Sequence, residues 1–372
     1  MKLSSNANLS VSAVSTGSLT LDLALGVGGL PKIAEAVEAA YNSAFCNKKQ
    51  TAQNKYCCLD DKNTMPLGGD RVVTTPEYSA YIKVAEGCDN HCTYCVIGNI
   101  RGKFRSRPIE DIVAEAKTLE ELGVKELNIV AQDTSRYGLD IYGEYALARL
   151  VKAITNETNI PWIRLLYCYP DKITDELCKE FATNDRLVKY IDMPIQHISD
   201  SVLKRMNRHG GSEVIKDAIA RLRAACPEIV LRTTVLVGFP GETDEDFEEL
   251  CEFIKETKFD RLGAFPYSAE EGTPAAEMDC QIDEQTKQDR YDIIMREQLY
   301  ISAEKTAAMV GKIVRVFCEG FDPVSETHFG RSEADAPDVD GKIFFTSKKK
   351  LPEGAFVDVK ITEALDYDLI GK

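Results

Sequence analysis

The stretch Gly87-Cys-Asp-Asn-His-Cys-Thr-Tyr-Cys95 carries most of what the sequence says about this chain. Cys88, Cys92 and Cys95 have C-x3-C-x2-C spacing, and they follow an alternating apolar run from Tyr81 that predicts a strand. A structural zinc site closes with four protein ligands, whereas an iron–sulfur cluster held by three cysteines leaves one iron open to a small molecule. The spacing therefore predicts an open iron–sulfur cluster of the kind that cleaves S-adenosylmethionine (SAM).

Two other interpretations of these cysteines stay open at this point. A zinc ion could use His91 as a fourth ligand, although His91 is crowded between Cys88 and Cys92. The cysteines could also be inert core material, because free cysteine is often buried.

Composition is ordinary for a soluble globular protein and fits the reducing cytosol. The 372 residues suffice for two domains or one large barrel with appendages. No apolar run reaches about 18 residues, and the N-terminus lacks the pattern of a secretion signal, so we expect no membrane association. Twelve cysteines without such a signal fit a reducing compartment better than a disulfide framework. A net charge of −15 argues against broad affinity for nucleic acid and favours a basic protein partner.

The middle of the chain alternates short apolar strands with amphipathic helical stretches. Strands are predicted at Tyr81–Glu86, Glu126–Ala131, Trp162–Cys168, Tyr190–Ile195, Ile229–Gly238 and Arg261–Tyr267. Helices are predicted at Pro108–Leu122 and at Asp244–Thr257, the second with Thr243 as N-cap. Six β-α units in a row predict an α/β fold with a parallel sheet, open or curled into a partial (β/α)6 barrel. In such barrels ligands bind at the carboxyl ends of the strands.

The two ends of the chain differ from this middle part. A long helix is predicted from Asp283 to about Met309, and Gly311–Lys372 is typical of a small β-barrel. Three strands are predicted there, at Lys312–Glu319, Lys342–Phe345 and Phe356–Ala364. This region holds nine Lys and Arg against twelve Asp and Glu, a difference of −3. Residues 1–74 read as an irregular or truncated segment with a helix at Pro31–Ala40 and no complete domain.

Candidate cofactor residues lie in the cysteine loop and where the predicted strands end. Tyr94 could pack on the adenine of SAM or anchor the loop. Gln132 opens a polar run to Gly138, and Gln196 with His197 ends the fourth strand. A solvated loop or a structural histidine would look similar.

The fifth strand adds three more candidates. Gly238 and Pro240 form a turn where glycine allows a ligand to approach the backbone. Arg232 could reach a carboxylate or ribose of SAM, or equally an acidic neighbour. A basic run after the cysteines could be a solvated face or could steer an anionic group toward the cluster; it consists of Arg101, Lys103, Arg105 and Arg107. The sequence assigns no catalytic acid or base.

These motifs resemble a known family. The quoted stretches are the cysteine loop and the runs Gln132-Asp-Thr-Ser-Arg-Tyr-Gly138, Asp192-Met-Pro-Ile-Gln-His197 and Val237-Gly-Phe-Pro-Gly-Glu-Thr243, together with Gly330-Arg-Ser-Glu-Ala-Asp-Ala-Pro-Asp-Val-Asp-Gly341 and Asp366-Tyr-Asp-Leu369. They resemble the bacterial methylthiotransferases of the radical SAM superfamily, in the RimO branch, from about Thr75 to Lys372. The resemblance implies a radical SAM core over residues 75–306 and a TRAM domain over 307–372.

The resemblance also implies an activity. In this branch a methylthio group is added to the β-carbon of an aspartate in a small-subunit ribosomal protein. Cys88, Cys92 and Cys95 would ligate a [4Fe–4S] cluster, SAM would act as radical source and as methyl donor, and a protein would supply electrons. The sister branch that modifies tRNA (MiaB-like) is the alternative, but its TRAM domain should be basic. The acidic TRAM region here favours a basic ribosomal protein.

The N-terminal region departs from the family pattern. The family carries a further domain there, whose three cysteines hold a second cluster. Only Cys46, Cys57 and Cys58 precede the loop, and their spacing does not resemble that domain. A segment within residues 11–31 instead resembles part of the recombinase RecA, without the phosphate-binding loop that should follow. We therefore expect one cluster with SAM, a doubtful second cluster, and either impaired sulfur transfer or a SAM-cleaving remnant.

Overall fold

The computed structural model describes residues 23–25, 56–58, 61–64, 66–69 and 73–372. In the first part, strand β1 (Leu23–Leu25) pairs in parallel with β2 (Tyr56–Cys58), and a 3-10 turn spans Lys62–Thr64. Of the predicted RecA-like fragment only residues 23–25 are described, and the predicted helix at Pro31–Ala40 lies outside the described residues.

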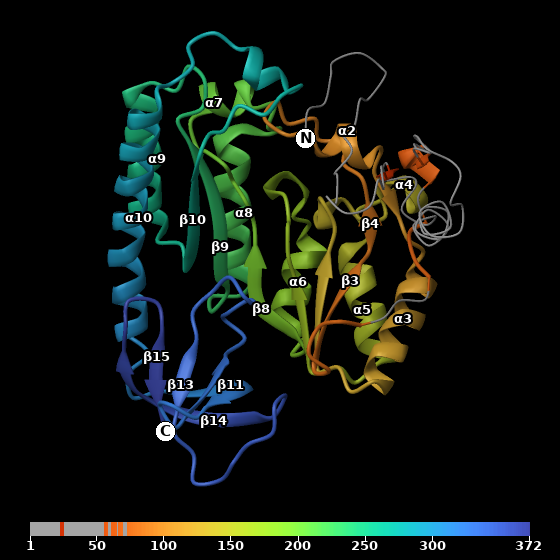
Figure 1. The fold of residues 1–372 in the computed structure, drawn as a ribbon, viewed down its shortest axis with the longest axis vertical. Coiled ribbons are helices and arrows are strands. Elements are labelled where there is room, and N and C mark those ends of the chain that lie inside the picture. The colour runs from red at the N-terminus through yellow and green to blue at the C-terminus, as the bar shows by residue number, and fades with distance from the viewer. Residues whose placement is uncertain (1–22, 26–55, 59–60, 65, 70–72) are drawn as a thin grey trace, which may run out of the picture.

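Six parallel strands form the central sheet, in the order β10-β9-β8-β7-β6-β3 (Figure 1). They are β3 (Ser79–Lys83), β6 (Glu126–Val130), β7 (Trp162–Leu165), β8 (Leu187–Asp192), β9 (Val230–Val237) and β10 (Arg261–Pro266). Strands β3 and β10 do not pair with each other, so the barrel is open. The prediction of six parallel strands is confirmed, although several of the strands are shorter than expected.

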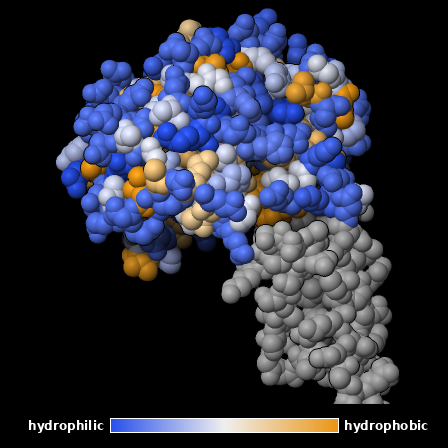
Figure 2. Space-filling view, turned by 90° about the horizontal axis from the view of Figure 1, so that it is seen from above, coloured by the Kyte–Doolittle hydropathy of each residue, from blue (hydrophilic) through white to orange (hydrophobic). Residues whose placement is uncertain are grey.

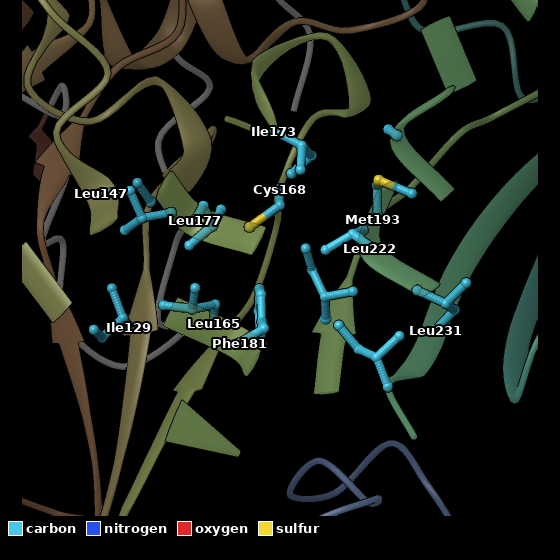
Figure 3. Packing of buried hydrophobic residues seen from close by; sticks show 14 of the residues in the cluster. Ile129, Leu147, Leu165, Cys168, Ile173, Leu177, Phe181, Met193, Leu222 and Leu231 are labelled. Atoms are coloured by element: carbon cyan, nitrogen blue, oxygen red, sulfur yellow. The ribbon is translucent and has the colours of Figure 1, made fainter. Parts of the chain in front are cut away.

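Helices cover the outer face of this sheet and bury its main core. They are α3 (Ile109–Glu121), α5 (Leu147–Glu157), α6 (Asp175–Thr183), α8 (Gly211–Ala225) and α9 (Asp244–Thr257). Strand residues such as Ile129, Leu165 and Leu231 point into this layer and meet Leu177 and Leu222 from the helices (Figure 3). Alternate positions of each strand face the same side, and for that reason one apolar set builds the core while the other set faces the barrel interior.

The long helix α10 (Glu284–Ala307) packs along β10 and α9 and leads into the C-terminal domain (Figure 1). That domain is a closed barrel of β11 (Ile313–Asp322), β12 (Thr327–Arg331), β13 (Ile343–Phe345), β14 (Phe356–Ala364) and β15 (Leu369–Gly371). Three of these strands were predicted. Strands β12 and β15 were not, because they are only five and three residues long and each contains a glycine.

The C-terminal barrel docks against the inner face of the sheet at the amino ends of its strands. Trp162, the first residue of β7, packs with ring centroids 5.4 Å from Phe317 and 4.9 Å from Phe356. Beside it, Arg331 of the C-terminal barrel pairs through both terminal nitrogens with Glu126, the first residue of β6. This end lies away from α7 (Asp200–Arg205) in Figure 1. The opposite end of the sheet is therefore left for ligands. Among the described helices, none has the length and apolar character needed to cross a bilayer.

Candidate metal and cofactor site

The cysteine loop lies between β4 (Ala85–Glu86) and the short helix α2 (Ile97–Arg101). Strand β4 pairs with β5 (Arg105–Ser106), which brings the two ends of the loop together. Gly87 has φ 83°, and a Cβ there would lie 2.0 Å from the Lys103 carbonyl oxygen. Only glycine fits this turn, after which the Cys88 N–H donates to the Gly102 oxygen at 3.1 Å.

The three cysteines share the wall of one cavity of about 420 Å³ beyond the carboxyl ends of β6 and β7. The cavity is lined by Cys88, His91, Cys92, Tyr94, Cys95, Ile97, Gly98, Asn99, Ala131, Gln132, Tyr167, Tyr169 and Pro274. The end of the molecule that carries α7 is otherwise mostly hydrophilic, with small and separate hydrophobic patches (Figure 2). The cavity is thus where the predicted parallel sheet should bind a ligand.

The thiols suit a cluster of soft metal ions. Burial raises the pKa of Cys88 to about 11 and raises that of Cys95, so both are neutral until a cationic centre compensates them. The Cys92 sulfur lies 3.3 Å from the Tyr169 hydroxyl, and the Ile97 N–H donates to the Cys95 sulfur at 3.4 Å. Within the described residues, no three Cys, His, Asp or Glu side chains are grouped to hold a single metal ion. Three thiols on one cavity wall suit an iron–sulfur cluster that leaves one iron open.

A buried polar network fixes the loop to the end of β6. Asp133 is fully buried, and it accepts from Asn90 of the loop at 2.8 Å and from Ser135 at 2.7 Å. Lys172 lies 3.3 Å from the same carboxylate. The polar run Gln132–Gly138 thus holds the cluster loop as well as facing the cavity.

The residues after α7 fix the loop from its other side. Thr93 donates through its backbone N–H to the Met206 oxygen and through its hydroxyl to the Arg205 oxygen, at 3.1 and 2.8 Å. Asn207 donates its side-chain amide to the His91 oxygen at 2.9 Å. Clamping on two sides holds the loop that carries the three cysteines beside the cavity before a cofactor binds.

Two of the predicted cofactor residues, Tyr94 and Gln132, lie on the cavity wall. Tyr94 packs edge-on to Phe239, with ring centroids 6.5 Å apart, so it also anchors the loop. The side-chain oxygen of Gln132 is buried and has no hydrogen-bond partner among the described residues. A buried acceptor without a partner calls for a donor from a bound molecule.

Three other predicted residues, Gln196, Gly238 and Pro240, are not part of the cavity lining. Gln196 has φ 69°, and its backbone forms an isolated bridge to Val235 of β9. A Cβ on Gly238 would lie 2.3 Å from Cγ of Lys287. Glycine is needed there because α10 packs against the turn. The glycine is therefore explained by packing, without a ligand that approaches the backbone.

Arg232 and His197 also point elsewhere. Arg232 lies in the amino half of β9, where its guanidinium donates to Asp192 at 2.7 Å and lies 3.7 Å from Asp340 of the C-terminal barrel. Of the two roles predicted for Arg232, the structure shows the contact with acidic neighbours. His197 is fully buried, and burial lowers its pKa to about 3, so it is a neutral core residue.

The basic run is largely occupied by neighbours. Arg107 pairs with Glu115 at 2.7 Å, Arg101 lies 3.6 Å from Glu86, and Arg105 donates to the Lys62 carbonyl. Little of the positive charge of this run is therefore left to steer an anionic group toward the cavity.

Two residues that the sequence reasoning missed complete the site. The Arg208 guanidinium lies 4.0 Å from the Tyr169 ring centroid, almost fully buried. Burial alone would lower the pKa of Arg208, but Tyr94, Tyr169 and Cys92 outweigh it and raise that pKa, so the buried group stays cationic. Tyr169 could have been found, since it follows a predicted strand at its carboxyl end. Arg208 could not, because only the turn after α7 brings it to Cys92.

Comparisons with known proteins identify the family of the chain. The radical SAM superfamily matches residues 82–254, and the TRAM domain matches residues 310–372. The ribosomal protein uS12 methylthiotransferase RimO of Clostridium tetani is 48% identical over 355 residues, which cover 94% of this chain and 77% of that protein. RimO of Desulforamulus reducens is 46% identical over 353 residues, covering 95% and 78%. The predicted extent of four-fifths of the chain was therefore too narrow, because the polar N-terminal region offered no motif to recognise.

Solved structures resemble the chain more distantly. Coproporphyrinogen III oxidase from Escherichia coli, a radical SAM enzyme, has a TM-score of 0.46 and 17% identity, over 60% of this chain and 53% of that one.

Proposed function

The chain belongs to the RimO family of uS12 methylthiotransferases, and on that premise we propose that it methylthiolates an aspartate β-carbon of this ribosomal protein. The observation that carries the proposal is the single cavity lined by Cys88, Cys92, Cys95 and Gln132, whose buried side-chain oxygen has no partner among the described residues. Cys88, Cys92 and Cys95 would hold a [4Fe–4S] cluster, and SAM would bind next to it. Together these groups supply one-electron reduction and the removal of a hydrogen atom from an unactivated carbon.

The residues of this chain bind and orient. Gln132 offers an acceptor to an amino or hydroxyl group of SAM, and Tyr94 offers an aromatic face to its adenine. Buried Arg208 places a positive charge near Cys92, which stabilises the negative charge of thiolate ligands. Gln196, Gly238 and Pro240 remain predicted SAM contacts, reached only where SAM extends past the cavity.

The charge of the chain supports a protein substrate over the tRNA alternative. A net charge of −15, with −3 in the C-terminal domain, opposes phosphate binding and suits a basic ribosomal protein. We expect the enzyme to act in the cytoplasm with a partner protein as electron donor. Binding of tRNA that falls steeply with salt would favour the alternative.

Iron counting and product analysis test the proposal together. After anaerobic reconstitution, about four irons per chain would mean one cluster and about eight would mean two. Mass spectrometry of uS12 should then show the methylthio group, with 5′-deoxyadenosine formed only when reductant is present. One cluster with 5′-deoxyadenosine but no modified uS12 would indicate the SAM-cleaving remnant, and no 5′-deoxyadenosine would refute the radical SAM assignment.

Single cysteine variants provide the control. Cys88→Ala, Cys92→Ala and Cys95→Ala should each lose the cluster absorbance and 5′-deoxyadenosine formation. Cys280→Ala removes an exposed cysteine outside the cavity lining and should keep both.

A further inference from the structure

Tyr167 lies on the wall of the cysteine cavity with its backbone in the left-handed region, at φ 60°. Bulky residues rarely adopt this conformation, because it costs energy. The side chain is 50% exposed, so burial of the ring does not compensate for the strain. Strain of this kind is kept where surrounding structure enforces it, and it often marks a functional position.

Hydrogen bonds on both sides hold Tyr167 in this conformation. Its N–H donates to Oδ2 of Asp192 at 3.0 Å, and its carbonyl oxygen accepts from the Thr134 N–H at 2.9 Å. The next N–H, of Cys168, donates to the Asp192 carbonyl oxygen at 2.9 Å. The residues that follow β6 and end β8 therefore fix the backbone of Tyr167, and with it the point on the cavity wall from which the ring extends.

The C-terminal barrel reaches the same carboxylate. Arg232 donates to Oδ1 of Asp192 at 2.7 Å, and its Nε lies 3.7 Å from Asp340. The Tyr190 hydroxyl donates to Asp340 at 2.7 Å. The carboxylates of Asp192 and Asp340 are 2% and 3% exposed, so solvent screens this chain of interactions little.

We propose that Tyr167 contacts the peptide substrate beside the cysteine cavity, and that Asp340 is a positioning residue that holds Tyr167 there through Arg232 and Asp192. The inference rests on the proposed function for the identity of the peptide. A half-exposed phenol ring on a fixed wall packs against a peptide with little loss of side-chain freedom. The C-terminal domain thereby shapes a substrate site although it docks at the opposite end of the sheet.

Binding measurements test this without turnover. The probe is a fluorescein-labelled synthetic peptide of uS12 that contains the target aspartate in its unmodified form. It is titrated with the full chain after anaerobic reconstitution, and binding is followed by fluorescence anisotropy. Tyr167→Ala should weaken peptide binding about tenfold, the loss of one well-placed contact. Binding of radiolabelled SAM, measured by equilibrium dialysis, should change less than about twofold. Tyr145→Ala removes a tyrosine that is 39% exposed outside the cavity lining, and it should leave both affinities unchanged.

A double-mutant cycle tests the positioning role. Asp340→Asn should weaken peptide binding about threefold to fivefold in the wild-type background, and much less when Tyr167 is already alanine. A purely structural role would give the same loss in both backgrounds. Fluorescence of Trp162, at the domain interface, reports whether Asp340→Asn leaves the C-terminal barrel docked.

Four outcomes would overturn the inference. Unchanged peptide affinity in Tyr167→Ala would show that Tyr167 does not contact the peptide. An equal loss of SAM affinity would show that Tyr167 contacts the cofactor instead. Additive effects in the cycle remove the role of Asp340. If the wild-type chain does not bind the peptide, the proposed substrate itself is refuted, and the inference falls with it.

Discussion

Glu126 is the single carboxylate that two fully buried guanidinium groups share between the domains. It accepts from Arg164 at 3.1 Å and, through both oxygens, from Arg331 of the C-terminal barrel; all three side chains are at most 2% exposed. Glu126→Gln keeps the volume but removes the charge. Removing one partner of a buried pair costs about 3 to 5 kcal/mol when the remaining charge is left uncompensated, and the lower end of that range applies here. Arg331 keeps its second carboxylate partner, Glu319, at 2.7 Å, whereas Arg164 loses its pairing with Glu126. We expect that loss in the free energy of unfolding at pH 7.

The pH dependence of this loss follows from the pKa of Glu126. Burial alone would raise the pKa, but Arg164 and Arg331 outweigh it and hold the pKa below its ordinary value of 4.5. A carboxylate with a lowered folded-state pKa stabilises the protein above its unfolded-state pKa, and the effect fades as pH falls through the folded value. The difference between wild type and Glu126→Gln should therefore be full at neutral pH and shrink below about pH 4.5.

Urea unfolding followed by tryptophan fluorescence measures this effect at the right place. Trp162 is the chain's only tryptophan, and it packs against Phe317 and Phe356 at the same interface. The control is Glu304→Gln, which breaks an exposed pair with Lys258 and should leave the free energy of unfolding almost unchanged. If Glu126→Gln costs no more than the control, or the same at pH 3 as at pH 7, the reasoning about a buried charge network is wrong.

The remaining predictions concern the loop, a helix cap and the strained tyrosine. Gly87→Ala should abolish cluster binding, since a Cβ would meet the Lys103 backbone, whereas Gly123→Ala, also at positive φ but with open space around it, should cost only about 1 kcal/mol and keep the cluster absorbance. Burial would raise the pKa of Asp246, but hydrogen bonds from Ser199, Thr243 and Ser201 lower it to about 2; Asp246→Asn should therefore cost about 2 kcal/mol at pH 7 and progressively less between about pH 4 and pH 2, and a pH-independent cost in urea titrations would contradict this. Tyr167→Gly should be about 1 kcal/mol more stable than Tyr167→Ala by thermal unfolding, because glycine relieves the left-handed strain at φ 60°, and equal midpoints would show that no strain is stored there.

Local spacing allowed much of the site to be predicted. The three predicted ligands, Cys88, Cys92 and Cys95, lie within eight residues. Because they share one short loop, the sequence alone predicts that they lie near one another. Alternating apolar strands and capped helices likewise predicted the parallel sheet, and Thr243 is the N-cap of α9 as expected. Tyr94 was predicted from its place in the cysteine loop and Gln132 from the rule that ligands gather at strand ends, and both line the cavity.

Only the tertiary structure decided which charged side chains meet. Arg331 pairs with Glu126 across 205 positions of sequence, and Arg232 faces Asp192 and Asp340 instead of the cavity. Arg208 reaches the cysteine loop through the turn after α7. The sequence by itself predicted the three metal ligands, because they are neighbours along the chain. It could not determine the ion pairs or the direction of Tyr167, because those depend on long side chains from separate strands meeting in one buried space.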